Sequence, residues 1–445
     1  MFCKFQLILA LMFLTVAVLS LVVSCALGDP SIQLWVVDAP KESPAVEKLA
    51  DVGYIDVWSS NSTHAQILVE PEVMPLVQQL LEESQINYWV EVEDVMSLVQ
   101  QERQFMKEVK ERTRRTRAAQ QMDWNTYHNM DDIEGFIGWV NATQGNLVRV
   151  LPAATTAEGR RVLVVKLTDP NSPGPKKKIW IEGGIHAREW ISPAVSTYIL
   201  NLLVTDESWR DLLKVTEWYI VPVANPDGYQ YTFTSDRARL WRKNRRDNGS
   251  PDGRCKGVDL NRNWNLKWGV GASKNPCSET YRGDSPFSEP ETRGLQAMMK
   301  EVGDIDLFIT FHSFGQTILY PWGWTRNPPA NVKQLKNLAK KFADTVREMS
   351  RGETEYEIGG SGPLYGLASG ATDDWAYGAL GVPYSYTIEL PDQGQYQFLL
   401  PESRISSTVV ETAAGIKCMI GSLTNTGFCA ARRVRRPDIF WFRSS

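Results

Sequence analysis

From Trp124 onward the chain alternates apolar strand-like segments with helical segments, and this pattern constrains its fold more than any other feature. Several strand segments are apolar along most of their length, as expected for sheet strands that are covered on both faces. Strands are predicted at residues 162–167, 178–182, 217–223, 307–311 and 384–389. Helices are predicted at residues 132–140, 193–204, 289–302, 331–351 and 406–423. The pattern predicts an α/β domain with helices on both faces of a central sheet, whose site lies at the carboxyl ends of the strands.

A smaller unit precedes this domain. Its predicted strands are residues 32–37, 54–58, 65–69 and 88–92, and its predicted helices are residues 42–52 and 73–83. The order βαββαβ is that of a ferredoxin-like α+β fold. Its charged residues form no catalytic constellation, and we therefore interpret residues 29–95 as a non-catalytic domain.

The first 28 residues are typical of a secretory signal peptide. Lys4 precedes an apolar run through Val23, and Ala26-Leu27-Gly28 offers small residues for cleavage. The alternative is an uncleaved anchor helix, because the run approaches the length that spans a bilayer. No later stretch is apolar enough to cross a membrane, and we expect a secreted protein. The net charge of -4 over 445 residues gives no electrostatic footprint for nucleic acid.

Cysteines and glycosylation sequons agree with export. After signal removal four cysteines remain, an even number that suggests disulfides: Cys255, Cys277, Cys418 and Cys429. Nearness favours pairing Cys255 with Cys277 and Cys418 with Cys429, although the sequence leaves the other pairings open. The sequons begin at Asn61, Asn141 and Asn248, and each alone is a weak signal.

A basic segment separates the two predicted domains. Residues 96–117 form a polar helix that ends in Lys110-Glu-Arg-Thr-Arg-Arg-Thr-Arg117. This segment could be an ordinary solvated helix face, but its position between two domains favours cleavage by a trypsin-like or dibasic-directed protease. The basic and aromatic tail, residues 429–445, is interpreted as disordered, with a surface anchor as the alternative.

Two of the four histidines lie at predicted strand ends. His186 follows the strand at residues 178–182 and opens the motif His186-Ala-Arg-Glu189, and His312 follows the strand at residues 307–311. A histidine and a glutamate three residues apart, joined by a distant histidine, form the open two-nitrogen, one-carboxylate ligand set of a catalytic zinc. The His-x-x-Glu motif alone is weak evidence.

Several longer motifs strengthen this interpretation, because in order and sequence they resemble the pancreatic-type A/B zinc metallocarboxypeptidases. The resemblance covers about residues 30 to 425. The motifs are His186-Ala-Arg-Glu-Trp-Ile-Ser-Pro193, Asn225-Pro-Asp-Gly-Tyr229, Trp241-Arg-Lys243, Gly257-Val-Asp-Leu-Asn-Arg-Asn-Trp264, Cys277-Ser-Glu-Thr-Tyr281 and Thr387-Ile-Glu-Leu390.

The resemblance implies a role for each residue of a zinc hydrolase. His186, Glu189 and His312 would bind one zinc ion per chain, and Asp259 would orient a ligand imidazole. Glu389 would take the proton of the attacking water and pass it to the leaving amine. Arg242 would stabilise the negative charge that develops on the peptide oxygen.

The resemblance also implies how a free C-terminus is recognised. The substrate carboxylate would be bound by an amide, a guanidinium fork and a phenol, with a second arginine further along the cleft. Asn261 would supply the amide, Arg262 the guanidinium fork and Tyr365 the phenol. Arg188 would be the second arginine. The substrates implied are peptide and protein C-termini.

Substrate preference depends on Thr372-Asp373-Asp374-Trp375. In the family that the chain resembles, the residue just before the Asp-Trp pair lies on the floor of the pocket for the leaving side chain, and here that residue is Asp373. A buried carboxylate needs a cationic partner, so the resemblance implies a preference for C-terminal lysine or arginine. It also implies that Gly360 stands where A-type enzymes carry a bulky residue, which leaves room for a long side chain. The chain has one more residue after Tyr365 than the family usually shows. Counting forward from Tyr365 would instead put Thr372 on the floor and predict an apolar preference. We favour Asp373, because insertions concentrate in loops. A second departure is Pro391, where the family usually has arginine.

The resemblance predicts a secreted, monomeric carboxypeptidase zymogen. A mixed sheet with helices on both faces, residues 118–428, would follow the ferredoxin-like prodomain and the connecting helix. The alternatives are a preference for apolar C-terminal residues and a non-catalytic binding protein on the same scaffold. Loss of a zinc ligand, of Glu389 or of Arg262 would favour the binding protein, and the sequence retains all of them.

Overall fold

The computed structural model describes residues 31–116, 122–250 and 255–427, which form two compact units. Residues 31–50 and 54–97 belong to the smaller unit, whereas residues 51–53 group with the larger unit, which resumes at Leu98. The predicted signal peptide, the last residue of the basic segment and the C-terminal tail lie outside the described residues. Among the residues that are described, no helix is both long and apolar enough to cross a bilayer.

The smaller unit has the predicted order βαββαβ. Its antiparallel sheet has the order β2-β3-β1-β4. The elements are β1 (Gln33–Val37), α2 (Pro44–Asp51), β2 (Ile55–Ser60), β3 (Ala65–Val69), α3 (Met74–Glu83) and β4 (Tyr88–Val92). Trp35, Val37 and Ile67 of the sheet pack against Val46 of α2 and Val77 of α3 in one apolar core. This is the ferredoxin-like arrangement that the sequence predicts.

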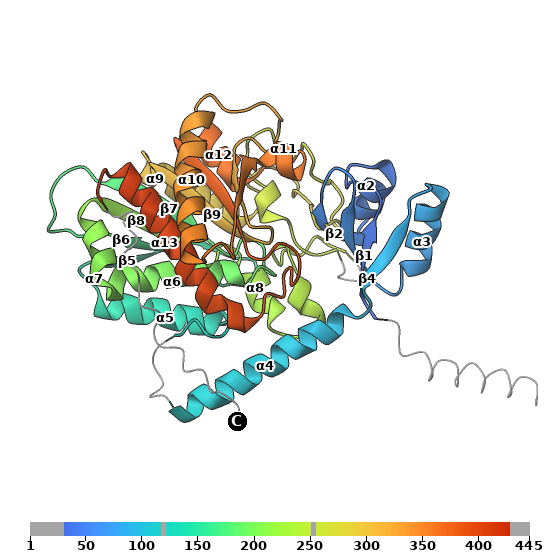
Figure 1. Cartoon of the computed structure of the whole chain (residues 1–445), viewed down its shortest axis with the longest axis horizontal. Helices are drawn as coiled ribbons and strands as arrows, with labels where there is room; N and C mark the ends of the chain where they lie inside the picture. The colour runs from blue at the N-terminus through green and yellow to red at the C-terminus, as the bar shows by residue number, and fades with distance from the viewer. Residues whose placement is uncertain (1–30, 117–121, 251–254, 428–445) are drawn as a thin grey trace, which may run out of the picture. The chain divides into compact units, whose positions relative to one another are not determined.

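The larger unit is built on a mixed eight-stranded sheet of order β11-β10-β12-β9-β7-β8-β6-β5 (Figure 1). Its strands are β5 (Val148–Thr155), β6 (Arg161–Leu167), β7 (Lys177–Glu182), β8 (Thr216–Val221), β9 (Leu307–Ser313), β10 (Thr317–Tyr320), β11 (Glu357–Gly360) and β12 (Tyr384–Leu390). The central strands β8, β7, β9 and β12 are parallel neighbours, as are β10 and β11. The pairs β5–β6, β6–β8 and β10–β12 are antiparallel. All five predicted strands are present.

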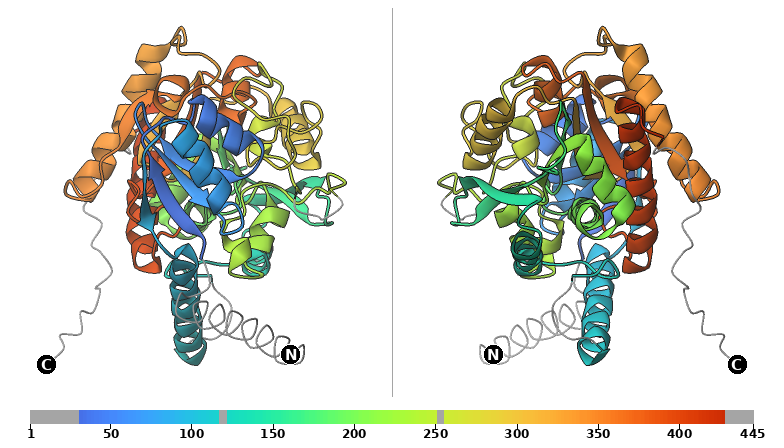
Figure 2. Two further views of the ribbon diagram at one scale, coloured as in Figure 1. Left: turned by 90° about the vertical axis from the view of Figure 1, so that its right-hand side faces the viewer. Right: turned by 90° about the vertical axis from the view of Figure 1, so that its left-hand side faces the viewer.

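Helices cover both faces of this sheet. One face packs against α5 (Met130–Thr143), α6 (Ile191–Thr205), α10 (Val332–Met349) and α13 (Ile405–Leu423). The other face packs against α9 (Pro290–Val302) and α12 (Thr372–Gly378). Helices α10 and α13 lie side by side (Figure 2), and a side chain on Gly415 would collide with the Phe342 ring. The sequence therefore predicted the layers of this domain correctly.

The remaining elements connect these layers. They are α4 (Val95–Thr116), α7 (Glu207–Arg210), α8 (Pro226–Thr232), α11 (Ser361–Tyr365) and the 3-10 helices η1 (Asp211–Lys214), η2 (Arg237–Leu240), η3 (Leu260–Arg262) and η4 (Glu402–Arg404). One prediction needs correction: β9 continues through His312 to Ser313, so His312 lies inside the strand rather than after it. The cross-strand pairing of His312 with Glu389 on β12 extends β9 past its apolar run.

Strand register places two rows of side chains on the sheet face that α9 and α12 cover. His312 on β9 pairs with Glu389 on β12. Two residues earlier, Thr310 on β9 lies between Glu182 on β7 and Thr387 on β12. Because residues two apart on a strand point to the same face, both rows point the same way. The row of His312 and Glu389 lies nearer the carboxyl edge of the sheet.

Candidate functional site

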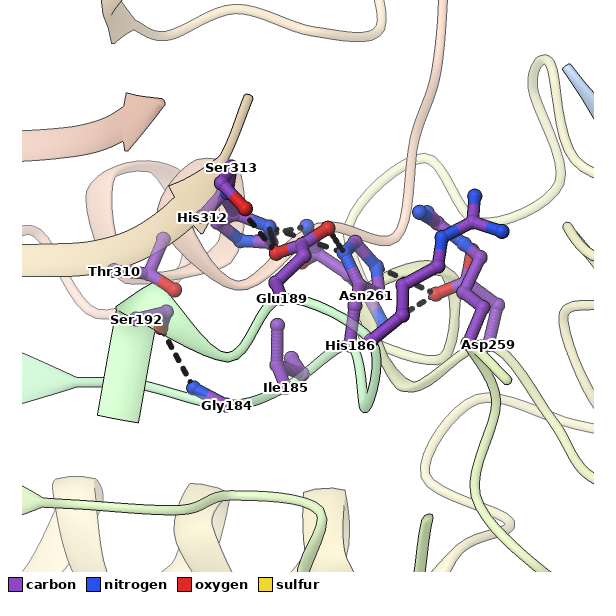
Figure 3. A network of polar contacts seen from close by, with 12 residues as sticks. Gly184, Ile185, His186, Glu189, Ser192, Asp259, Asn261, Thr310, His312 and Ser313 are labelled. Carbon is purple, nitrogen blue, oxygen red and sulfur yellow. Dashed lines mark hydrogen bonds and ion pairs between the residues drawn. The ribbon is translucent and has the colours of Figure 1, made fainter. Parts of the chain in front are cut away.

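Three buried metal-binding side chains converge at the carboxyl edge of the sheet (Figure 3). His186 and Glu189 lie in the turn between β7 and α6, and His312 lies near the end of β9. Because β7 and β9 are parallel neighbours, this turn and this strand end meet at one edge. One ligand atom from each side chain lies within 4.8 Å of the others. The structure thus brings together the three predicted ligands.

The geometry of this cluster fits a shared cation. Nδ1 of His186 lies 2.7 Å from Oε1 of Glu189, and Nδ1 of His312 lies 3.1 Å from Oε2 of Glu189. The two Nδ1 atoms are only 3.1 Å apart. Two ligands of a tetrahedral zinc, each about 2.0–2.1 Å from the ion, are separated by about 3.3 Å. Two nitrogens and a carboxylate at this spacing are the donor set that zinc prefers.

Asp259 connects the cluster to an arginine. Its Oδ1 lies 3.2 Å from Nε2 of His186, which leaves Nδ1 of that ring facing the ligand set. Its Oδ2 accepts from Nε and Nη2 of Arg242 at 3.2 and 2.9 Å. Burial alone would raise the pKa of Asp259, but the charges of Arg242 and Arg262 hold that pKa well below its usual range. Asp259 therefore fixes both the imidazole and the guanidinium as a carboxylate.

Glu389 lies directly beside the ligand His312 in the sheet. Burial raises the pKa of Glu389 to about 8 against the attraction of His312, and the charge of Glu189 adds to the increase. Glu189 likewise raises the pKa of His312 to about 9, although burial lowers it. A divalent cation at the ligand set would favour the carboxylate form of Glu389 and the neutral form of His312. Glu389 is thus a carboxyl group next to the candidate metal site, where its carboxylate form is able to accept a proton.

Asn261 and Arg262 lie on η3, one turn after Asp259. The Asn261 amide lies 3.5 Å from Nε2 of His312, and its oxygen accepts from the backbone N–H of Thr372 at 3.0 Å. Arg262 donates from Nη1 to the carbonyl of Asn261 at 2.8 Å, whereas its buried Nε has no hydrogen-bond partner. Burial lowers the pKa of Arg262. A half-buried guanidinium with an unused donor is suited to an incoming anion.

A disulfide closes the loop that carries these residues. Cys255 and Cys277 are bonded, so their predicted pairing is confirmed, and Asp259, Asn261 and Arg262 lie between them. The Lys243 ammonium donates to the carbonyls of Pro276 and Ser278 at 2.7 and 3.0 Å and holds the far side of the loop. Cys418 is also disulfide-bonded, and its expected partner, Cys429, lies outside the described residues.

The Tyr365 hydroxyl reaches this site despite the extra residue that follows it. It lies 3.1 Å from the hydroxyl of Thr317, which pairs across the sheet with Glu389. A side chain at Gly315 would collide with the Tyr365 hydroxyl, so only glycine permits this approach. Nothing in the sequence indicated Thr317, because its contact depends on how β10 and β12 pair.

The two consecutive aspartates at the start of α12 have different environments. Asp374 accepts from the backbone N–H groups of Gly323 and Trp324, so it anchors a loop. Asp373 is 3% exposed, and burial raises the pKa of its carboxyl. The Thr372 hydroxyl lies 3.4 Å from the Asn261 oxygen. Asp373 is thus a buried carboxylate beside the carboxylate-binding candidates.

The predicted outer arginine, Arg188, is fully buried against a second arginine that sequence reasoning missed. Arg188 stacks on Phe398 with 4.1 Å between the guanidinium carbon and the ring centroid. Arg239 donates to the backbone carbonyls of Arg188 and Phe398 and forms a two-point ion pair with Glu102 of α4, at 2.6 and 3.0 Å. The basic cluster around Trp241 is the only sequence signal for Arg239.

Comparisons with known proteins agree with this geometry. The profile of the family described as "Zinc carboxypeptidase" matches residues 133–415, and that described as "Carboxypeptidase activation peptide" matches residues 40–102. The chain is 43% identical over 308 residues to carboxypeptidase B of Astacus astacus, covering 68% of this chain and 99% of that protein. It is 35% identical over 374 residues to carboxypeptidase A2 of Mus musculus, covering 82% and 86% of the two chains.

Solved structures extend the likeness to both units. The structure of carboxypeptidase A from Helicoverpa armigera superposes with a TM-score of 0.81 at 28% identity, covering 91% of this chain and 98% of that chain. The structure of thrombin activatable fibrinolysis inhibitor superposes with a TM-score of 0.75 at 29% identity, covering 89% and 99%.

Proposed function

The chain belongs to the zinc carboxypeptidase family and carries that family's activation peptide, and we propose that it is a secreted zymogen whose mature form removes C-terminal lysine or arginine. One observation supports this most directly: His186, Glu189 and His312 converge with Glu389 beside them. A non-catalytic binding protein would have no need of a proton acceptor at this position.

We assign one zinc ion per chain to His186, Glu189 and His312. Bound there, zinc would acidify a water molecule at neutral pH and polarise the substrate carbonyl. Glu389 would accept the proton of the attacking water and deliver it to the departing amine. Arg242, held in place by Asp259, stabilises the negative charge on the peptide oxygen. Asp259 keeps the His186 ring in the orientation that metal binding requires.

Recognition of a free C-terminus falls to the side chains around η3. The unused Nε donor of Arg262 and the Asn261 amide would bind the terminal carboxylate. Tyr365 would close over the same group from the α11 side, and Arg188 would act further along the chain of the substrate. A substrate without a free carboxylate would leave the Arg262 charge buried and unpaired, which is why an exopeptidase is favoured over an endopeptidase.

The preference for basic residues is supported by the environment of Asp373. This buried carboxylate has no lysine or arginine as an ion-pair partner within the described part of the chain, so a cationic substrate side chain would supply one. Gly360, at the end of β11, is buried, and a Cβ there would lie 3.2 Å from Cδ of Pro363. Relatives of both A and B types match the chain, so substrate kinetics must decide.

Matched peptides that end in lysine, phenylalanine, leucine or glutamate provide the test of this function. The activated protein should give its highest kcat/KM with lysine. The best rate with phenylalanine would refute the basic preference but not the hydrolase, and no hydrolysis of any peptide by zinc-loaded, activated protein would refute the hydrolase.

Metal removal should abolish activity. We expect a zinc chelator to lower kcat by a factor of at least about 100, because the polarising cation is worth several kcal/mol, and added zinc should restore the rate. Metal analysis should find one zinc per chain in the wild type and none retained by a Glu189→Ala variant. Full activity in protein shown to be free of metal would contradict the proposal.

The structure supports a role for α4 in latency. Glu102, within the residues matched by the activation peptide family, pairs with the fully buried Arg239 beside Arg188. Arg103 adds an ion pair with Asp236 at 2.7 Å and bonds to the Thr232 and Ser235 carbonyls. These contacts would keep α4 on the catalytic unit until a trypsin-like or dibasic-directed protease cuts the basic segment in which the helix ends.

Nicking with trypsin should therefore activate the precursor. We expect intact precursor to hydrolyse a lysine-ended peptide roughly 100-fold more slowly than nicked protein, the ratio for a site that is open about 1% of the time. The measurement is the initial rate before and after nicking, with cleavage followed by mass spectrometry. Equal rates would refute latency while leaving the hydrolase in place.

A further inference from the structure

We infer that Glu182 is a second specificity-determining carboxylate, which lies beneath Asp373 and reinforces selection of a cationic substrate side chain. The inference rests on the proposed preference for lysine or arginine and adds a residue that no sequence motif indicated. Glu182 is the last residue of β7 and follows three apolar residues, Ile179, Trp180 and Ile181.

The strand register places Glu182 in a polar row next to the row that contains His312 and Glu389. Glu182, Thr310 and Thr387 lie side by side on β7, β9 and β12, two residues before the level of His312 and Glu389. Two residues of strand span about 6.6 Å. The four-carbon stem of a lysine covers a similar distance. A lysine whose terminal peptide bond lies at Glu389 would thus bring its ammonium to the level of this row.

Contacts with α12 join this row to the proposed pocket floor. Helix α12 packs on strands β9 and β12, and the Ser385 hydroxyl of β12 donates to the backbone carbonyl of Asp373 at 2.7 Å. The charge of Asp373 is close enough to raise the pKa of Glu182. Both carboxyl groups therefore lie on the side of the sheet that α12 covers.

Glu182 lacks the cation that a buried carboxylate ordinarily has. It is 0% exposed, its Oε1 accepts from the Thr310 hydroxyl at 3.3 Å, and its Oε2 has no hydrogen-bond partner. Within the described residues no lysine or arginine forms an ion pair with it. Burial raises the pKa of Glu182 to about 7, and the neighbouring Asp373 charge adds to the increase. Buried carboxylates without a partner are rare, so a cation from outside the chain is the natural complement.

The two carboxyl groups would act together on the substrate. An ammonium or guanidinium group that enters the pocket would pair with Asp373 and also experience the negative charge of Glu182 through a medium of low polarity. An apolar side chain would gain nothing from either group. Loss of the Glu182 charge should therefore weaken basic substrates selectively, with less effect on apolar ones.

The test compares a Glu182→Gln variant with a Glu291→Gln control. Glu291 on α9 is also 0% exposed, has an unpartnered Oε1 and a pKa that burial raises to about 8, but it contacts Asn244 rather than the polar row. We expect Glu182→Gln to lower kcat/KM for a lysine-ended peptide about ten-fold, the size of a charge interaction at several ångströms in a medium of intermediate polarity. The phenylalanine-ended peptide should change by less than about two-fold, and the control should keep the wild-type ratio.

Two further measurements separate the alternatives. Calorimetry should show weaker binding of free lysine, but not of free phenylalanine, to Glu182→Gln, while Glu182→Asp should retain most of the preference. A lysine-to-phenylalanine ratio that Glu182→Gln leaves unchanged, or a loss of zinc from that variant, would overturn the inference while the proposed function stands. A wild-type preference for phenylalanine would overturn the basic preference itself and this inference with it.

Discussion

Replacement of Glu389 by glutamine is expected to lower kcat/KM by a factor of about 10²–10⁴, the contribution of a positioned general base. Glutamine keeps the size of the side chain and its place beside His312 but cannot accept a proton. The loss should appear in kcat, because Glu389 is not among the groups proposed to bind the substrate carboxylate. Zinc content and thermal stability should stay close to those of the wild type.

Glu357 offers a matched control for this variant. It lies on β11 across from Thr317, so it flanks the same residue as Glu389 from the opposite side, but its side chain is exposed. Glu357→Gln should have wild-type kinetics on every peptide. If Glu389→Gln keeps more than about a tenth of the wild-type kcat with normal zinc content, Glu389 is not the general base.

The second large effect is expected at Asp373. Substitution by asparagine should lower kcat/KM for lysine-ended peptides by about 10²–10³, because removal of one partner of a buried ion pair costs about 3–5 kcal/mol. Peptides that end in phenylalanine or leucine should retain their rates or improve, since burial of the uncharged amide is less costly. The preference should therefore change from basic to apolar, as measured by competition between two peptides in one reaction.

Asp374, the next residue of α12, allows a test of which aspartate forms the pocket floor. Its carboxylate accepts three backbone N–H bonds from residues 323 and 324, so Asp374→Asn should reduce stability and all activities together. A selective change at Asp373 and a uniform change at Asp374 would fit the assignment made here. A selective loss of basic activity at Asp374 instead would show that the pocket floor had been assigned one residue too early.

The parts of the fold that the sequence predicted are those with repetitive apolar patterns. Strands β6 to β9 and β12 each contain apolar residues that are buried on both faces, and the long helices have a continuous buried stripe. The sequence analysis missed β5, which contains Pro152 and lies at the sheet edge, and the four-residue strands β10 and β11. It also missed α12, which has no N-cap side chain. Such elements form through tertiary contacts rather than through their own pattern.

The residues of the site can also be divided into those that the sequence indicated and those that it did not. Its metal-binding side chains could be proposed from the strand ends and the His-x-x-Glu spacing, although β9 extends further than its apolar run. The Glu102–Arg239 pair joins residues 137 apart in the sequence, and the row of Glu182, Thr310 and Thr387 depends on the register of three strands. Contacts of this kind are set by topology, so one chain read in order does not reveal them.

The Cys255–Cys277 bond gives the enzyme a dependence on its surroundings that neither the metal nor the general base has by itself. Two of the proposed carboxylate-binding residues, Asn261 and Arg262, lie on the segment that this bond closes. His312 and Glu389 lie on strands of the sheet, and His186 lies in the turn after β7. In a reducing compartment the loop of residues 255–277 would no longer be closed by a disulfide, although the zinc ligands would still come together. Such a protein would bind zinc but would bind peptide C-termini weakly. Oxidative folding in an export pathway would then be needed for tight substrate binding as well as for stability.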